Sequence, residues 1–127
     1  MKVFISIPMN GRPDEEVLSE MKTIIQDYED IYGGETELIE TLLPMDDTPV
    51  SNERIYMLGR SIQLMAQADA VIFAPNWKKA RGCRVEELVA KSYGIRRYYY
   101  LRKGKLIDSE HGLFVYGCPE NYETDDF

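Results

Sequence analysis

Residues 68–77, ADAVIFAPNW, and residues 81–90, RGCRVEELVA, decide the fold of this chain. The apolar first segment predicts a buried strand. The loop after it carries the only tryptophan, Trp77, and the second segment predicts a helix with Gly82 and two glutamates near its start. A strand, a loop and a helix in this order are typical of an α/β protein.

The start of the chain has the same order. Residues 2–7 are mostly apolar and β-branched, which predicts a second buried strand. Pro13 and the acidic residues after it predict the start of an amphipathic helix that ends near the glycines at 33–34. A later helix is expected to begin after Ser51 or Asn52, either of which can cap it. Its expected apolar face consists of Ile55, Leu58, Ile62 and Met65.

Further strands are expected at residues 35–43, 95–101 and 113–116. Helices between successive strands imply right-handed crossovers and parallel pairing. We therefore expect an α/β fold, a flavodoxin-like or Rossmann-like three-layer sandwich with a parallel sheet of four to five strands. Residues 1–127 then form one domain, with a tail from about residue 119.

The composition argues against several classes of protein. The chain has 44% hydrophobic and 29% charged residues, as a folded domain does. Its net charge of -7 argues against nucleic acid as a partner, because phosphate backbones attract basic surfaces. No apolar run approaches the roughly 20 residues of a membrane span, and no secretory leader is visible, so we expect a cytoplasmic protein without a membrane partner. Cys83 and Cys118 are expected to be reduced and structural, with no metal and no cofactor.

The ligand of an open α/β sheet binds outside the carboxyl ends of the strands. Three loops are then expected to converge, at residues 8–12, 44–52 and 75–81. They would surround the amino-terminal turn of the helix that begins near Arg81. Because the amino end of a helix attracts anions, a small anionic ligand fits this edge of the sheet even in an acidic chain.

Glu86 is the candidate for chemistry at this edge. The face of its helix that we expect to be buried consists of Val85, Leu88, Val89 and Ser92. Glu87 then points to solvent and pairs with Lys91, while Glu86 lies beside the core where Gly82 leaves room for a substrate. Two interpretations stay open, because Glu86 either complements the helix dipole or acts as a nucleophile at an anomeric carbon.

Trp77 also has two interpretations. Its flat apolar face suits stacking on a purine or pyrimidine. Alternatively, it is a packing residue of the core. Lone His111, in a polar turn, is expected to have no special role.

Three segments carry a resemblance to a known superfamily. They are residues 4–12, FISIPMNGR, residues 68–72, ADAVI, and residues 82–86, GCRVE, with Ala90 four residues on. In this order they are similar to the nucleoside 2-deoxyribosyltransferase superfamily, which includes the 2′-deoxynucleoside 5′-phosphate N-hydrolases. Within it, the sequence resembles the branch of small proteins that carry the domain DUF4406. The likeness covers roughly residues 2–101.

The resemblance implies a covalent mechanism. Gly82, Glu86 and Ala90 match the superfamily's pattern of glycine, glutamate and alanine at four-residue steps. The glutamate of that pattern attacks C1′ of the deoxyribose and displaces the base, and water or a second base then resolves the glycosyl-enzyme. Together with the loops above, the resemblance gives as candidate substrate-binding residues Phe4, Pro8, Met9, Asn10, Gly11, Ser61, Trp77, Arg81 and Gly82.

The sequence departs from the transferases at three positions. Phe4 stands where they have a tyrosine that contacts the nucleophile, and Ala80 and Ser61 stand where they have aspartates. Without the aspartate that handles the base, the obvious proton donor to the leaving group is missing. Ser61 and the loop at residues 10–12 could instead suit a 5′-phosphate, as could Arg81. Asp69 is expected to be structural.

We therefore expect cleavage or transfer of the N-glycosidic bond of a (deoxy)nucleoside or nucleoside 5′-monophosphate, with Glu86 as nucleophile. One alternative is a non-catalytic nucleotide-binding protein of the same fold. Another is a hydrolase that cleaves NAD at its nicotinamide ribosidic bond. The resemblance also implies that the chain forms a homo-oligomer, a dimer or larger.

Overall fold

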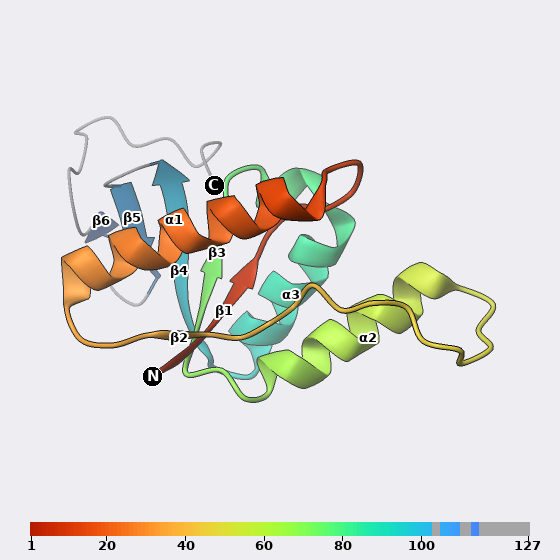
Figure 1. The fold of residues 1–127 in the computed structure, drawn as a ribbon. Coiled ribbons are helices and arrows are strands. Elements are labelled where there is room, and N and C mark those ends of the chain that lie inside the picture. Colours follow the sequence, from red (N-terminus) through yellow and green to blue (C-terminus); the bar gives the residue numbers. More distant parts are fainter. Residues whose placement is uncertain (103–104, 110–112, 115–127) are drawn as a thin grey trace.

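The computed structural model describes residues 1–102, 105–109 and 113–114, and it is an α/β fold (Figure 1). The strands are β1 (Lys2–Ser6), β2 (Glu37–Leu38), β3 (Ala70–Phe73), β4 (Arg96–Arg102), β5 (Lys105–Asp108) and β6 (Leu113–Phe114). The helices are α1 (Asp14–Tyr32), α2 (Glu53–Met65) and α3 (Arg81–Ser92), with a short 3₁₀ helix, η1 (Trp77–Lys79), before α3. His111, Cys118 and the expected tail lie outside the described residues.

The strands form one sheet in the order β2-β1-β3-β4-β5-β6. β1 pairs in parallel with β2 and β3, and β3 pairs in parallel with β4, as the helical crossovers predict. β4 and β5 pair antiparallel, and so do β5 and β6. The sheet is therefore mixed, and the prediction of a purely parallel sheet of four to five strands is wrong at this edge.

The sequence analysis does not predict β5. Arg102 of β4 pairs directly with Lys105 of β5, so only residues 103–104 connect the two strands. A parallel neighbour would need a crossover of a dozen or more residues, so a connection this short leaves only antiparallel pairing. The expected strand at 113–116 is present as β6, at Leu113–Phe114, and its remaining residues lie outside the described ranges.

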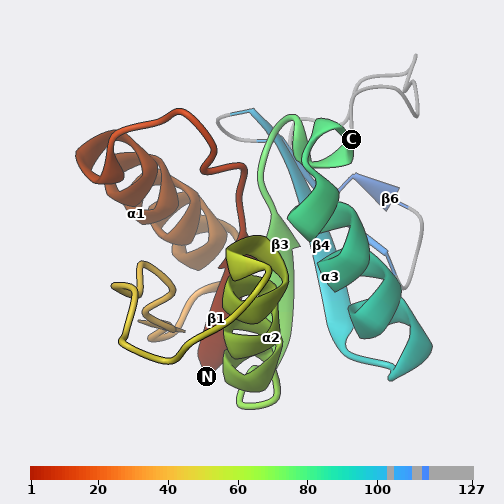
Figure 2. The same ribbon diagram turned by 90° about the vertical axis from the view of Figure 1, so that its right-hand side faces the viewer.

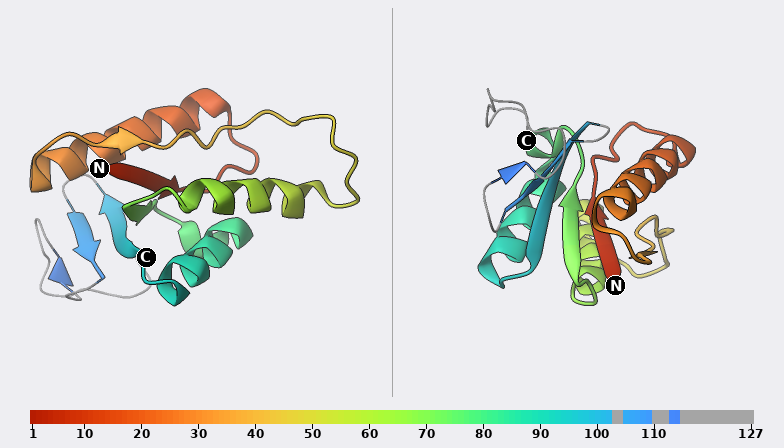
Figure 3. Two further views of the ribbon diagram at one scale, coloured as in Figure 1. Left: turned by 90° about the horizontal axis from the view of Figure 1, so that it is seen from below. Right: turned by 90° about the vertical axis from the view of Figure 1, so that its left-hand side faces the viewer.

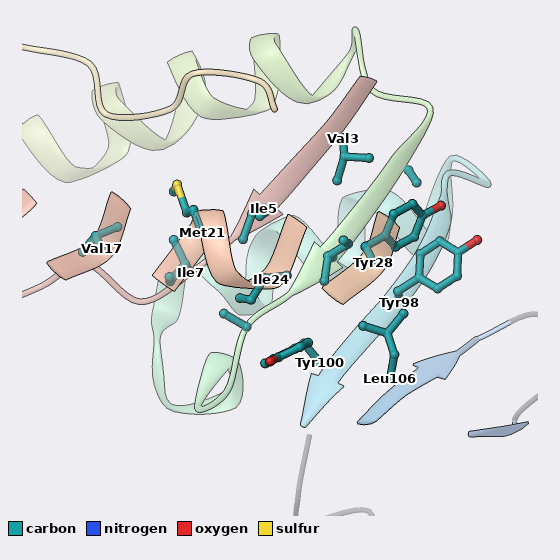
Figure 4. Close-up of a cluster of buried hydrophobic side chains, with 13 residues drawn as sticks. Val3, Ile5, Ile7, Val17, Met21, Ile24, Tyr28, Tyr98, Tyr100 and Leu106 are labelled. Atoms are coloured by element: carbon teal, nitrogen blue, oxygen red, sulfur yellow. The ribbon is translucent and has the colours of Figure 1, made fainter. Parts of the chain in front are cut away.

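Helices cover both faces of the sheet. Figures 2 and 3 show α1 on one face and α2 and α3 on the other. Successive side chains of β1 point to opposite faces of the sheet. Val3 and Ile5 belong to a buried cluster with side chains of α1 (Figure 4), whereas Phe4 belongs to a second cluster with side chains of α2 and α3.

The helix ends follow the sequence signals. Acidic residues occupy the first turn of α1, and Gly33 ends this helix with a φ of 76°, a left-handed value that favours glycine. Asn52 caps α2, since its side chain accepts a hydrogen bond of 3.0 Å from the backbone N–H of Ile55. None of the helices in the described ranges is long and apolar enough to span a membrane.

Two elements differ from expectation. The strand predicted at 35–43 is reduced to Glu37–Leu38 at the edge of the sheet. Ile39 still donates its backbone N–H to the carbonyl of Val3 at 2.9 Å, and the chain then leaves the sheet. In α2, only Met65 of the expected apolar face is buried, and Ile55 is 67% exposed. The amino-terminal half of α2 extends beyond the end of the sheet, so it has no strand beneath it (Figures 1 and 3).

Candidate functional site

A hollow of about 1020 Å³ opens at the carboxyl ends of β1 and β3, between these strands and helices α2 and α3. All three loops that were expected to converge contribute to it, through Pro8, Met9, Asn10, Asn52, Asn76, Lys79, Ala80 and Arg81. A second depression of about 650 Å³ runs along α1 and is lined by residues of that helix alone. Because a ligand site needs groups that converge from several elements, the hollow beside β1 is the candidate site.

Glu86 of α3 lines this hollow and is only 7% exposed. Its Oε1 accepts a hydrogen bond of 2.7 Å from Oγ of Ser6, the last residue of β1. Burial raises the pKa of the Glu86 carboxyl to about 7, and the hydrogen bond from Ser6 opposes the rise because it favours the charged form. A carboxyl group with this pKa is partly ionised at neutral pH, so both its charged and its neutral form are present there.

The buried face of α3 differs from the helical-wheel prediction. Its buried residues are Cys83, Glu86 and Ala90, which lie three and four positions apart and so share one side of the helix. Leu88, expected in the core, is 61% exposed. The wheel was oriented by the apolar residues, and this orientation is wrong because a glutamate occupies the centre of the buried side.

Glu87 has partners other than the predicted one. Its Oε2 lies 3.1 Å from Nη1 of Arg97 and accepts a hydrogen bond of 2.9 Å from the hydroxyl of Tyr99. Both partners belong to β4, so Glu87 fastens α3 to the sheet. The expected solvated pair with Lys91 is therefore wrong, and the two neighbouring glutamates have separate roles, with Glu87 tied to β4 and Glu86 turned to the hollow.

Most of the predicted substrate-binding residues are brought together in the hollow. Its lining includes Phe4, Pro8, Met9, Asn10, Ser61, Arg81 and Gly82. A Cβ at Gly82 would meet Cδ1 of Leu58 at 3.8 Å, an ordinary contact, so the glycine leaves space that a side chain would occupy. Gly11, with a φ of 75°, shapes the turn after β1 but is not among the lining residues.

Trp77 is not among the lining residues either. It is 8% exposed and packs in the core, with ring centroids 5.3 Å from Phe73 and 5.6 Å from Tyr99. Of its two interpretations, this position matches the packing residue. Asp69 is likewise used structurally, since its Oδ2 accepts a hydrogen bond of 2.7 Å from the backbone N–H of Lys2.

Basic side chains surround the hollow. Those that line it are Arg54 of α2 and Lys79, Arg81 and Arg84 of η1 and α3. Ala80, at the amino end of α3, gives the helix no side-chain cap, so the backbone N–H groups of its first turn have no partner of that kind. Arg12, which was expected to suit a phosphate, is held instead by Glu20 at 2.6 Å and Glu16 at 3.2 Å. The basic character of the hollow therefore comes from α2, η1 and α3.

Cys83 also lines the hollow. Burial raises the pKa of its thiol to about 12, so the group is neutral and packs as a small apolar side chain. Within the part of the chain that the structure describes, no three His, Cys, Asp or Glu side chains gather as a metal ion would require.

Ser6 and Thr41 are among the residues of the site that the sequence analysis missed, as are the lining residues Arg54, Lys79, Cys83 and Arg84. Ser6 lies two residues after Phe4, so both point to the same face of β1. Ser6, at the next position on that face, therefore supplies the hydroxyl donor that Phe4 lacks. The alternation of side chains along a strand could have indicated Ser6 from the sequence. Thr41 lines the hollow and is 6% exposed, but nothing in its neighbourhood in the sequence distinguishes it.

Comparison with known proteins gives the family. Neither a curated protein nor a solved structure matches the sequence. A family model described as "Domain of unknown function (DUF4406)" matches residues 1–99. The matched residues include every residue that lines the hollow. The chain belongs to the DUF4406 family.

Proposed function

We propose that this chain cleaves the N-glycosidic bond of a nucleoside 5′-monophosphate or nucleoside, with Glu86 as the nucleophile. The observation that carries the proposal is the buried Glu86 carboxyl group, which lines the hollow and is held by the Ser6 hydroxyl at 2.7 Å. The strand order β2-β1-β3-β4 with helices on both faces is typical of flavodoxin-like and Rossmann-like sandwiches, which bind ligands at this end of the sheet. The resemblance to the nucleoside 2-deoxyribosyltransferase superfamily supports the same chemistry.

The reaction needs one carboxylate at an anomeric carbon. An oxygen of ionised Glu86 forms a bond to C1′ while the bond from C1′ to the base nitrogen breaks, and the electron pair leaves with the base, which takes up a proton from water. Water, or the nitrogen of a second base, then attacks C1′ and releases the carboxylate. The Ser6 hydroxyl holds one carboxylate oxygen, which directs the other toward the sugar.

The basic lining favours a phosphorylated substrate. Arg54, Lys79 and Arg81 line the hollow of a chain whose net charge is -7. Basic groups concentrated in one hollow of an acidic protein attract an anion to that hollow. The uncapped amino end of α3 adds backbone N–H groups that suit phosphate oxygens. We therefore place nucleoside 5′-monophosphates before nucleosides as substrates.

A second candidate is a nucleotide-binding protein without turnover. Ala80 and Ser61 line the hollow where the transferases carry aspartates. Asp14, the other carboxylate among the described lining residues, is exposed at the start of α1. The hollow thus holds no second buried carboxylate among the described residues to protonate a leaving base, which favours binding over reaction.

A substrate panel separates the two candidates. Free base is measured by chromatography after incubation with deoxynucleosides, their 5′-monophosphates and NAD. We expect release of base from at least one 5′-monophosphate and a loss of activity of at least about 1,000-fold in Glu86→Gln, because a neutral amide replaces the attacking carboxylate. Glu35→Gln, at an exposed position before β2, is the control and keeps the activity, because Glu35 lies outside the hollow. Binding without release would favour the second candidate.

The pH dependence tests the role of Ser6. Activity should rise with pH around 7 as Glu86 ionises, well above the ordinary glutamate value of 4.5. Ser6→Ala removes a hydrogen bond that favours the charged form of Glu86. The acid limb of the pH profile of kcat/KM should therefore move to higher pH by roughly half to one pH unit. Ser19→Ala, on the exposed side of α1, should leave the limb in place. A limb that stays in place or moves down in Ser6→Ala contradicts the assignment.

The burial of Glu86 also predicts a stability effect. Glu86 loses its proton near pH 4.5 in the unfolded chain and near pH 7 in the folded chain. The contribution of protonated Glu86 to the free energy of unfolding is therefore complete below pH 4.5 and is lost as the pH rises through 7. Gln does not titrate, so Glu86→Gln does not lose this stability. The free energy of unfolding of Glu86→Gln, relative to that of the wild type, should therefore rise by roughly 2–3 kcal/mol from pH 4.5 to pH 8.

Urea unfolding at the two pH values measures this gain. Glu35→Gln, at an exposed position before β2, is the control and should not show it. An equal effect of Glu86→Gln at both pH values would mean that the carboxyl group is hydrated in the native state.

A further inference from the structure

Thr41 has a buried hydroxyl group without a partner. The residue lies in the connection between β2 and α2, lines the same hollow as Glu86 and is 6% exposed. Its Oγ1 makes no hydrogen bond with any of the described residues. Trp77 Nε1 is in the same condition, but Trp77 does not line the hollow. Thr41 therefore combines an unsatisfied polar atom with a place in the candidate site.

An unsatisfied buried hydroxyl group needs an explanation, because nearly all such groups in folded proteins are hydrogen-bonded. Its burial is unfavourable in the free protein, and a valine of the same shape would avoid the penalty. A ligand that enters the hollow can supply the missing partner. The hydroxyl group can then donate or accept, so it fits either kind of polar atom on a base edge.

The surroundings of Thr41 indicate which part of a ligand it meets. Its neighbours Leu42 and Leu43 line the hollow together with Leu58 of α2, and they form an apolar wall. The basic lining residues are Arg54, one turn before Leu58 on α2, and Lys79, Arg81 and Arg84, which lie outside the Thr41 segment. An apolar wall with one hydroxyl group suits a flat heteroaromatic base, whereas the basic groups suit a phosphate. Trp77, the predicted stacking surface for a base, is packed in the core, so this apolar wall is the surface that a base can contact.

We infer that Thr41 is a specificity-determining residue, whose hydroxyl group pairs with a polar atom on the base of a bound nucleoside or nucleotide. This inference rests on the proposed function, because it takes the ligand to carry a base. It concerns binding and not the bond-breaking step. The hydroxyl group therefore contributes to the affinity of a base-carrying ligand and not to that of the sugar phosphate alone.

The test compares Thr41→Val with Thr23→Val, a threonine on the exposed side of α1. Unfolding of the free proteins is followed first. Affinities for deoxynucleoside 5′-monophosphates and for 2-deoxyribose 5-phosphate are then measured by calorimetry in the Glu86→Gln background, where turnover does not consume the ligand.

Thr41→Val should have an unchanged or higher Tm and bind the preferred mononucleotide roughly 3- to 10-fold more weakly, as the loss of one neutral hydrogen bond implies. Its affinity for the sugar phosphate should not change, and Thr23→Val should match the parent protein in both measurements. A lower Tm for Thr41→Val would overturn the inference, since the hydroxyl group then has a partner in the free protein. So would an unchanged mononucleotide affinity.

The failures of the two proposals are distinguishable. Mononucleotide binding without any release of base by the wild type refutes the proposed reaction, and the Thr41→Val affinities still decide the inference. Release of base together with unchanged Thr41→Val affinities refutes the inference alone. If no base-carrying ligand binds, both are overturned.

Discussion

The burial of one carboxyl group against β1 is the constraint on which the site depends. A carboxylate removed from water is unfavourable unless neighbouring groups compensate, and the hydrogen bond that the described residues give Glu86 comes from Ser6. One neutral donor offsets only part of the penalty, which is why the pKa of Glu86 is raised to about 7. Ionised Glu86 is therefore unfavourable for folding, and carboxyl groups with pKa values raised in this way cluster at functional sites.

The fold holds this group in place through elements on both sides of it. The parallel pairing of β1 with β3 brings the ends of these two strands together, and α3 begins after the short connection from β3 that contains η1. Glu87 fastens α3 to β4 through Arg97 and Tyr99, which fixes the rotation of the helix and turns the next-door Glu86 toward Ser6. Of the two adjacent glutamates, Glu87 thus anchors the helix and Glu86 lines the hollow.

The sequence predicted the parallel half of the fold well, because strong signals mark it. Apolar strands, the helix ends at Gly33 and Asn52 and the convergence of three loops all appear in the structure. The antiparallel edge was missed because β5, at Lys105–Asp108, has only four residues and therefore gives a weak pattern in the sequence. The buried side of α3 was misjudged because apolar patterning cannot identify a face whose central residue is a glutamate. Thr41 could not be predicted, because the burial of its hydroxyl group without a hydrogen-bond partner depends on the three-dimensional surroundings and leaves no mark in the sequence.

Trapping the covalent intermediate tests the central claim most directly. A mononucleotide analogue with fluorine at C2′ slows hydrolysis of a glycosyl ester, so the adduct can accumulate. Mass spectrometry of the intact chain should then show the added mass of one sugar phosphate, and peptide mapping should locate it on Glu86. Base released without an adduct, or an adduct on another residue, would contradict the assignment of Glu86 as the nucleophile.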